Sequence, residues 1–590
     1  MTGEPRSSSY TRRAFVRTAA TAGIAVSLAH WGSPPAHATL AAHRVAVLGG
    51  GMAGLAAAHE LAERGFEVVV YERKALGGKA RSIVTDLPAL DGRRPLPGEH
   101  GFRFFPGFYH NVPDTMRRIP FPGNGNGVWD NLVTAPTSLV AFDGGDILVP
   151  FGLTPELPGA VTPQALAESL VGVVKLAQRL PPAEIVTFAR RLAIFLTSCE
   201  ERRYGQWEHI SWMEFIQAQG KSEAYRHYLA KVLTRALVAA KEQVASSRTI
   251  GNMADAFLAT LLLQGNDGAP DRVLNLPTNE AWIDPWVDHL RNLGVRFEVG
   301  ATVESLRVER GRVAGLGVSD AEGRRMIDVD WVVCAVPVER ATRLWNRDVL
   351  ALDPALEAMN DLSTDWMNGI QFYLTSDDPI TEGHIGLVDS PWALSGLNQA
   401  QFWRSRDIAR DYGDGTVRDI LSVDISDWNT PGILYGRPAV QCSRDEIAAE
   451  VWAQLKAALN DGQPNRLRDQ DLHSYHLDPA IQWSTVTGRN TNDEPLLVNT
   501  AGSWDKRPDA RTAIPNLFLA GDYVRTDVDL ATMEGANESG RAAVNALLDA
   551  ADSNAPRAQV FKLYRLPQLE PAKQLDRLRY LAGQPHILDG

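Results

Sequence analysis

Three glycines near the start of the chain have the spacing of a phosphate-binding turn. Gly49, Gly51 and Gly54 form a Gly-x-Gly-x-x-Gly pattern directly after the apolar residues 44–48. In such a turn the first glycine permits a sharp bend, the second lets the backbone approach a pyrophosphate, and the third lets a helix pack closely on a strand. A helix that begins here points free N–H groups and its positive dipole end at the phosphates. The pattern therefore predicts a dinucleotide site.

A carboxylate follows at the place where a dinucleotide site requires one. The predicted helix covers residues 55–62 and stops at Gly65, and a second apolar strand at 68–71 leads to Glu72. Glu72 follows Gly49 by 23 positions, where a carboxylate accepts hydrogen bonds from ribose hydroxyls. A strand, a turn, a capped helix, a second strand and a terminal acid thus agree, which a chance glycine-rich turn would not explain.

A second glycine pair favours FAD over NAD as the dinucleotide. Gly77, Gly78 and Lys79 follow Arg73 closely and precede Arg81, so positive charge is expected near a pyrophosphate. NAD-binding units do not need this feature. The segment resembles the second motif of the amine-oxidase and carotenoid-desaturase flavoprotein superfamily.

The C-terminal part of the chain completes this resemblance. Residues 516–520 are an apolar strand that ends in Gly521 and Asp522, and Met533 to Ala536 (Met-Glu-Gly-Ala) open a helix. In the superfamily the aspartate meets ribityl or pyrophosphate oxygens, and the helix N-terminus points at the flavin ring, where it stabilises negative charge on the reduced flavin. Because no cysteine lies near this motif, the resemblance implies that FAD is bound without a covalent link.

Between these motifs we expect strands at 294–299, 303–308 and 331–336. The resemblance implies a backbone contact between Val303 and the adenine. The residues expected to bind FAD are Gly49, Gly51, Met52, Ala53, Gly54, Glu72, Arg73, Gly78, Lys79, Gly101, Phe102, Val303, Gly521, Asp522 and Met533.

The amino-acid sequence of the motifs favours one branch of the superfamily. The segment from Glu99 to Phe105 (Glu-His-Gly-Phe-Arg-Phe-Phe) resembles plant-type phytoene and zeta-carotene desaturases, whereas Thr532 stands where amine oxidases usually carry an aromatic residue. The resemblance implies hydride transfer to flavin from an apolar, isoprenoid- or carotenoid-like substrate. Two alternatives stay open: an amine or amino-acid oxidase that releases hydrogen peroxide, with Trp504 or Tyr523 as an aromatic wall, and a non-redox isomerase that uses reduced flavin.

No acid–base pair or triad is apparent in the sequence. Removal of a hydride relies on cofactor chemistry, with the protein supplying orientation and a dry channel. Arg103 is the one catalytic candidate, because its segment should pass the flavin ring, where a cation could steady an anionic reduced flavin or a cationic intermediate. A surface or pyrophosphate-binding arginine is the alternative interpretation. The histidines lack metal-ligand spacing, so no metal site is expected.

Charge and composition limit the kinds of partner that the protein can bind. The chain has 590 residues and a net charge of −12, which argues against nucleic acid because phosphate contacts need a basic surface. The glycine-rich residues 123–127 lack a preceding strand, so no second nucleotide site, and hence no NAD(P)H, is expected. We therefore expect an apolar small-molecule substrate and an electron acceptor such as oxygen or a quinone.

The first 38 residues have the features of a targeting signal. Arg12 and Arg13 precede a mildly apolar stretch at 18–31, and Ala36-His37-Ala38 has the form of a cleavage site. This order resembles a twin-arginine signal peptide, so we expect export to the cell envelope or medium, or a cytoplasmic location if the signal is not used.

These observations predict an α/β chain. A Rossmann-like FAD-binding domain of the amine-oxidase type is expected from segments 43–115, 286–345 and 496–552. An interleaved α+β substrate domain is expected to have a helical part at 116–285 and a sheet part at 346–495, with a tail at 553–590. Helical patterns at 165–171 and 186–196 are expected to form core rather than rest on a membrane, although peripheral membrane contact stays open.

Overall fold

The structure, a computed structural model, describes residues 44–150, 179–232, 234–235, 240–461 and 465–589. The signal expected over residues 1–38 and the helix expected over residues 165–171 lie outside this range. Both therefore stay predictions.

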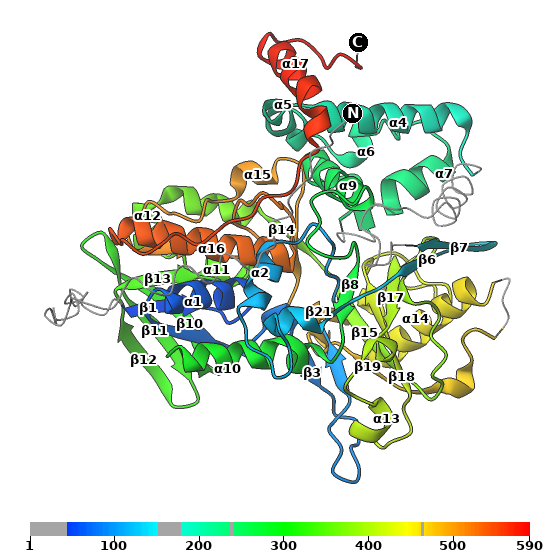
Figure 1. Ribbon diagram of the computed structural model, residues 1–590, viewed down its shortest axis with the longest axis horizontal. Coiled ribbons are helices and arrows are strands. Elements are labelled where there is room, and N and C mark those ends of the chain that lie inside the picture. Colours follow the sequence, from blue (N-terminus) through cyan, green and yellow to red (C-terminus); the bar gives the residue numbers. More distant parts are fainter. Residues whose placement is uncertain (1–43, 151–178, 233, 236–239, 462–464, 590) are drawn as a thin grey trace, which may run out of the picture. The chain divides into compact units, whose positions relative to one another are not determined.

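A five-stranded parallel sheet forms the dinucleotide-binding part of the fold (Figure 1). Its order is β23 (Leu517–Leu519), β13 (Trp331–Cys334), β1 (Arg44–Leu48), β2 (Glu67–Glu72) and β9 (Arg296–Val299). Strands from both ends of the chain are thus neighbours. Burial on both faces explains the nearly continuous apolar runs of β1, β2, β13 and β23, whereas the edge strand β9 is largely exposed. The predicted α/β class and the expected strands are confirmed.

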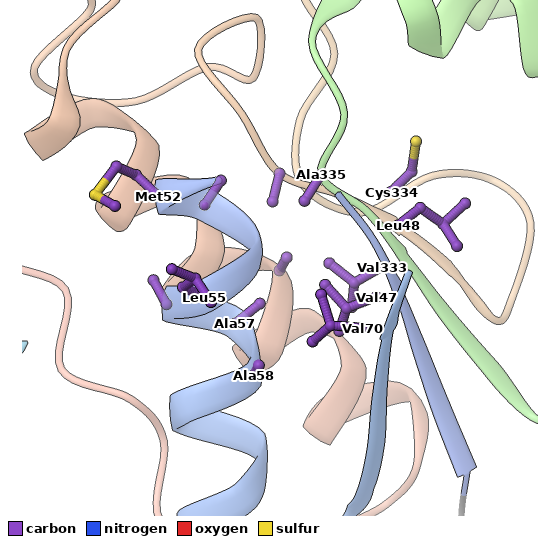
Figure 2. Packing of buried hydrophobic residues seen from close by; sticks show 14 of the residues in the cluster. Val47, Leu48, Met52, Leu55, Ala57, Ala58, Val70, Val333, Cys334 and Ala335 are labelled. Atoms are coloured by element: carbon purple, nitrogen blue, oxygen red, sulfur yellow. The ribbon is translucent and has the colours of Figure 1, made fainter. Parts of the chain in front are cut away.

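Two helices cover this sheet and pack tightly on each other. They are α1 (Met52–Glu63) and α16 (Met533–Ala550). Leu55, Ala57 and Ala58 of α1 are fully buried, and Figure 2 shows them beside valines of the sheet. Gly540 of α16 lies so close to α1 that an added Cβ would be 2.6 Å from the carbonyl oxygen of Ala53. The close packing fixes the N-terminal and C-terminal motifs relative to each other.

A three-stranded antiparallel sheet extends from the first. It consists of β10 (Thr302–Glu309), β11 (Arg312–Asp320) and β12 (Gly323–Asp328). Val303 lies on β10, just after Ala301, whose N–H donates to the carbonyl oxygen of Glu72 at 3.0 Å. The structure therefore brings Val303 next to the strand that carries Glu72.

A seven-stranded sheet, which we call the substrate sheet, forms the second part of the fold. Its order is β19 (Leu472–Leu477), β15 (Asn368–Leu374), β18 (Asp419–Ile425), β17 (Leu394–Asn398), β16 (Gly383–Leu387), β6 (Thr137–Phe142) and β7 (Gly145–Pro150). Neighbouring strands are antiparallel except β16 and β6, which are parallel. The expectation that residues 116–285 are a helical part is incomplete, because this segment contributes β6 and β7 to the sheet.

Helices from the middle of the chain form a layer with the C-terminal helix (Figure 1). It includes α4 (Pro182–Thr197), α5 (Glu200–Gly205), α9 (Ser247–Leu261) and α17 (Glu570–Leu581). Buried Asp576 of α17 pairs with Arg202 of α5 at 2.9 Å, which holds the tail on this layer. The helix expected at 186–196 is confirmed, and the C-terminal tail contains α17. Among the described residues, we find no helix both long and apolar enough to cross a bilayer.

The remaining elements connect these parts or pack on them. They include β3 (Ser82–Val84), β4 (Pro97–Glu99), α2 (Asn111–Arg117), β5 (Leu132–Thr134), α6 (Trp212–Phe215), α7 (Glu223–Tyr225), β8 (Arg272–Leu274), α10 (Asp284–Asn292), α11 (Val338–Ala341), α12 (Arg347–Leu352), β14 (Ser363–Asp365), α13 (Ile408–Asp411), α14 (Arg444–Leu459), β20 (Ile481–Ser484), β21 (Arg489–Asn492), β22 (Leu496–Val498) and α15 (Ser503–Lys506).

Candidate active site

The two glycine motifs predicted from the sequence are in direct contact. A Cβ added to Gly78 would lie 2.8 Å from the Cα of Gly51, and Gly78 has a φ of 56°, which disfavours a side chain. The N–H of Gly77 donates to the carbonyl oxygen of Gly50 at 2.8 Å. Backbone thus meets backbone at this point, and position 78 requires glycine.

The first glycine motif is shaped as a phosphate-binding turn. Gly49 has a φ of 100°, and a Cβ on Gly54 would lie 1.9 Å from the carbonyl oxygen of Gly49. Helix α1 begins directly after Gly51 and has no side chain that caps its first amides. The N–H groups of Met52 and Ala53 and the positive dipole end are therefore available for an anion.

Glu72 lies at the end of β2, as expected. Its carboxylate accepts the N–H of Gly50 at 2.8 Å and the N–H of Lys74 at 2.7 Å. These two bonds fix the carboxylate beside the turn, and a carboxylate has lone pairs left for ribose hydroxyls.

The basic residues that follow the glycine pair have partners within the chain. Asp493 pairs with Arg73 at 3.0 Å and with Lys74 at 2.6 Å, and Arg81 makes two hydrogen bonds to Glu494 at 3.1 and 3.2 Å. Burial would raise the pKa of Asp493, but the two cations lower it to about 2. Sequence reasoning did not identify this acidic pair, and the contacts of Arg73 with a cofactor stay a prediction.

Glu339 is a residue that sequence reasoning missed. It lies on α11, shortly after β13, and burial raises its pKa, while the charge of Lys79 acts against this shift and that of Asp522 adds to it. Its Oε1 is buried and has no hydrogen-bond partner among the described residues. An acceptor held beside the two predicted residues Lys79 and Asp522 suits a ligand rich in hydroxyl groups.

The C-terminal motif is held by hydrogen bonds on both sides. Gly521 has a φ of 130°, and its N–H donates to the hydroxyl of Ser539 at 2.8 Å. Thr532 caps α16 by accepting the N–H of Gly535 at 3.0 Å, so Met533 is the first helical residue. Glu534 caps α2: its carboxylate accepts the N–H groups of residues 110, 111 and 112 at 2.8, 2.6 and 2.9 Å. The motif therefore positions the helix N-terminus rather than providing a free acid.

The segment from Gly101 to Arg103 crosses the substrate sheet at very short range. A Cβ on Gly101 would lie 2.5 Å from Oδ1 of Asp424, and a Cβ on Gly369 of β15 would lie 2.9 Å from the Cα of Gly101. Glycine on both sides lets this segment lie directly on the sheet. This contact explains why the sequence has Gly101 there.

Arg103 is half-buried, and its role stays a prediction. One Nη donates to the carbonyl oxygen of Lys79 at 2.9 Å, and Nε is buried without a hydrogen-bond partner among the described residues. Burial lowers the pKa of Arg103 and raises the pKa of neighbouring Glu99, which accepts the hydroxyl of Thr278 at 2.6 Å. A cavity of about 20 Å³ adjoins both residues. Its lining combines polar and apolar residues: Glu99, Arg103, Val273, Leu274, Leu276, Pro277, Thr278, Leu397, Gln399, Phe402 and Trp403.

Two histidine–carboxylate pairs, absent from the sequence prediction, lie near this segment. Nδ1 of His384 lies 2.7 Å from Asp271, and Nδ1 of His100 lies 2.6 Å from Asp478. Each pair joins residues more than a hundred positions apart, so spacing along the chain contained no signal for it.

Two groups of histidines and acids have metal-like proximity, His59 with Glu63 and His289, and His100 with Asp478 and Glu494. In both groups a guanidinium already meets a carboxylate, Arg118 at 2.5 Å from Glu63 and Arg81 at 3.1 Å from Glu494. We assign no metal to either group, because a neighbouring cation opposes a second one.

Comparisons with known proteins agree with this geometry. Residues 52–548 match the family described as flavin containing amine oxidoreductase. A carotenoid phi-ring synthase from Streptomyces griseus is 25% identical over 522 residues, which cover 86% of this chain and 87% of that protein. A zeta-carotene desaturase from Synechocystis sp. is 25% identical over 542 residues, with 86% and 97% covered. The structure of cyclohexylamine oxidase from Brevibacterium oxydans is similar in fold, with a TM-score of 0.54, 14% identity, and 86% of this chain and 99% of that chain covered.

Proposed function

Because the chain belongs to the family of flavin-containing amine oxidoreductases, we propose that it binds FAD non-covalently and dehydrogenates an apolar, isoprenoid-like substrate. The family consists of FAD-dependent oxidoreductases, so the proposal concerns the substrate and the manner of cofactor binding.

The residues around the two glycine motifs fit FAD. The turn at Gly49–Gly51 and the uncapped start of α1 suit a pyrophosphate, and Glu72 suits a ribose. Glu339, with its unpartnered oxygen beside Asp522, suits the hydroxyls of a ribityl chain. When bound, the flavin supplies the acceptor for a hydride.

The observation that carries the substrate proposal is the similarity to relatives whose named activities concern carotenoids. The cavity beside Arg103, at about 20 Å³, has room for about one water molecule and is too small for an isoprenoid chain, so it does not decide the substrate. The named activities of the relatives from Streptomyces griseus and Synechocystis sp. concern carotenoids, which supports an isoprenoid-like substrate. At 25% identity the particular molecule stays open.

Arg103 has one electrostatic role consistent with its charge. A guanidinium stabilises negative charge, such as that of a reduced flavin, and would destabilise a cationic intermediate. Of the two roles expected for Arg103, we therefore keep only the stabilisation of an anion.

The amine-oxidase alternative is weakened by the two aromatic residues considered for its wall. The ring of Trp504 stacks on the guanidinium of Arg248 at 4.1 Å, and cations already surround it. Tyr523 is fully buried and donates its hydroxyl to the carbonyl oxygen of Cys334 at 3.1 Å. Neither side chain is placed to receive an ammonium group.

Export through the twin-arginine pathway, an acceptor such as oxygen or a quinone, and peripheral contact with a membrane belong to the same proposal. The twin-arginine route carries folded proteins, which suits a protein that must bind FAD before it crosses the membrane.

Anaerobic titration of the purified yellow protein with squalene- or phytoene-type isoprenoids tests the proposal. Bleaching of the flavin absorbance would support dehydrogenation of an apolar chain. A protein that stays yellow with isoprenoids but bleaches with amines and then forms peroxide in air would refute it. A change in double-bond geometry that needs pre-reduced flavin would favour the isomerase instead, and a colourless protein after reconstitution would exclude FAD.

A further inference from the structure

The cofactor motifs lie along one edge of the five-stranded sheet. The sheet is parallel, so the carboxyl ends of β2, β1, β13 and β23 follow one another along this edge. Glu72 is the last residue of β2, the turn at Gly49 follows β1, and Asp522 follows β23. A dinucleotide binds across the carboxyl edge of such a sheet. The chain that follows β13 therefore lies between the phosphate-binding turn and Asp522.

The end of β13 is in direct contact with that turn. The N–H of Ala335 donates to the carbonyl oxygen of Leu48 at 2.8 Å, and a Cβ added to Gly49 would lie 2.8 Å from the carbonyl oxygen of Ala335. Helix α11 begins at Val338, and Glu339 is in its first turn. Glu339 is thus the first acidic residue after β13 on the edge that FAD would cross.

The carboxyl group of Glu339 is surrounded by charge but has no donor. Its Oε1 is buried, and no donor in the described part of the chain reaches it. Three charged groups act on it: Lys79 of the second glycine motif, Asp522, and Arg340 on its own helix. Two of the three thus come from the motifs predicted to bind FAD.

Both cations near Glu339 have other partners. The ammonium group of Lys79 donates to the carbonyl oxygen of Pro495. Arg340 pairs with Asp493, the acid that holds Arg73. Among the described residues Glu339 therefore has no ion pair of its own that would keep it ionised.

The surroundings of Glu339 favour its protonated form. Burial raises its pKa, and the charge of Asp522 adds to this shift, while Lys79 and Arg340 oppose it. The pyrophosphate of FAD would bring further negative charge to the same edge and raise the pKa again. An ionised carboxylate can only accept hydrogen bonds, whereas a protonated one donates an O–H. The oxygens of a phosphate or a ribityl chain accept such a bond.

We propose that Glu339 binds FAD as the protonated acid and donates its O–H to an oxygen of the cofactor, so that FAD is held less tightly once Glu339 loses this proton. The inference rests on the proposed non-covalent binding of FAD and adds a dependence on pH. If the bound cofactor raises the pKa of Glu339, the affinity is highest below the pKa of the FAD-free protein. It then falls by up to about tenfold per pH unit until the pKa of the complex is reached.

Dilution of the purified yellow protein at several pH values tests the inference. At each dilution, the FAD that passes an ultrafiltration membrane is measured by its fluorescence against standards at the same pH, which gives Kd without any assay of activity. The phosphates of FAD stay ionised throughout this range. We expect Kd to be at least about tenfold higher near pH 8.5 than near pH 5.5.

Variants assign the dependence on pH to Glu339. Glu339→Gln keeps a donor, the amide N–H₂, but cannot titrate, so its Kd should be low and equal at both pH values. Glu339→Ala removes the donor as well, so its Kd should be independent of pH and about tenfold higher than that of Glu339→Gln. The control is Glu357→Gln, which changes an exposed glutamate of residues 354–361 and should keep the wild-type dependence. Other titrating groups act equally in all four proteins.

The outcomes separate the two proposals. A wild-type Kd that is constant or falls as pH rises refutes the role of Glu339 without any variant and leaves the binding of FAD intact. That role is equally refuted if Glu339→Gln or Glu339→Ala keeps the wild-type dependence, and either variant alone is sufficient. A protein that is colourless at every pH, or that keeps its flavin after denaturation, would contradict the non-covalent binding of FAD, and the role of Glu339 would fall with it.

Discussion

Replacement of Asp424 by asparagine probes the buried carboxyl on β18 that lies against Gly101. Burial raises the pKa of Asp424 from 3.8 to about 7, and the charge of Arg103 and the N–H of Phe102 offset burial only in part. Between these two pH values the folded protein keeps a proton that the unfolded chain releases. The free energy of unfolding must therefore fall as pH rises from about 4 to about 7, and the loss is complete above about pH 7.

The size of this effect follows from the pKa difference. A change from 3.8 to about 7 corresponds to about 4 kcal/mol of unfolding free energy, as an order of magnitude. The asparagine side chain keeps a carbonyl oxygen for the N–H of Phe102 and has no charge to bury. We expect Asp424→Asn to match the wild type near pH 4 and to be more stable than it near pH 8. Glu538, whose pKa burial raises to about 8, adds a slope of the same sign to both proteins and cancels in their difference.

Urea denaturation of the two proteins, followed by tryptophan fluorescence at several pH values with FAD in excess, measures this difference. The control is Asp469→Asn, because hydrogen bonds from Lys456 and Trp452 lower the pKa of exposed Asp469. A lowered pKa adds stability that is lost only as pH falls below the usual range of an aspartate, so this variant should show a constant difference from about pH 5 to pH 8. A constant difference for Asp424→Asn as well would refute the assignment of the slope to Asp424.

Three other substitutions test the cofactor site. Gly78→Ala should weaken FAD binding by at least about tenfold in a fluorescence titration, because its Cβ would lie 2.8 Å from the Cα of Gly51. The control is Gly92→Ala, which should bind FAD normally, because Gly92 has a similar φ of 74° and open space around it. Equal affinities of the two variants for FAD would contradict the argument. Arg103→Met should lower the midpoint potential of the flavin in a spectroelectrochemical titration, and an unchanged potential would show that Arg103 does not stabilise the reduced form. Glu534→Gln should cost about 1–3 kcal/mol of unfolding free energy in urea, because its amide N–H₂ would face backbone donors, and no loss would mean that the cap of α2 is dispensable.

Local pattern was sufficient to predict the dinucleotide-binding part of the fold. The apolar strands at β1, β2 and β13 and the turn at Gly49–Gly54 depend on residues that are close in sequence, so composition and spacing identify them. The pairing of β23 with β13 could be expected only through the family resemblance, since it joins segments far apart in the chain.

The substrate sheet and the His384–Asp271 pair were much less accessible to prediction. Strands β6 and β7 lie in a segment judged helical, and their membership of the sheet depends on pairing with β16, more than two hundred residues away. His384 and Asp271 are ordinary residues in sequence and become a pair only when β16 and β8 come together. Long-range contacts of this kind determine the chemistry and leave no periodic signal.

The order of strands in the five-stranded sheet also determines when the two halves of the cofactor site are synthesised. β1 and β2 leave the ribosome early, but β23 and α16 are made more than 440 residues later. At typical rates of 5–20 residues per second, the first half of the cofactor site waits roughly half a minute to a minute and a half for the second. During this time the apolar faces of β1 and α1 lack the helix that later covers them. We expect FAD to bind only after translation of α16, and nascent chains to depend on chaperones until then.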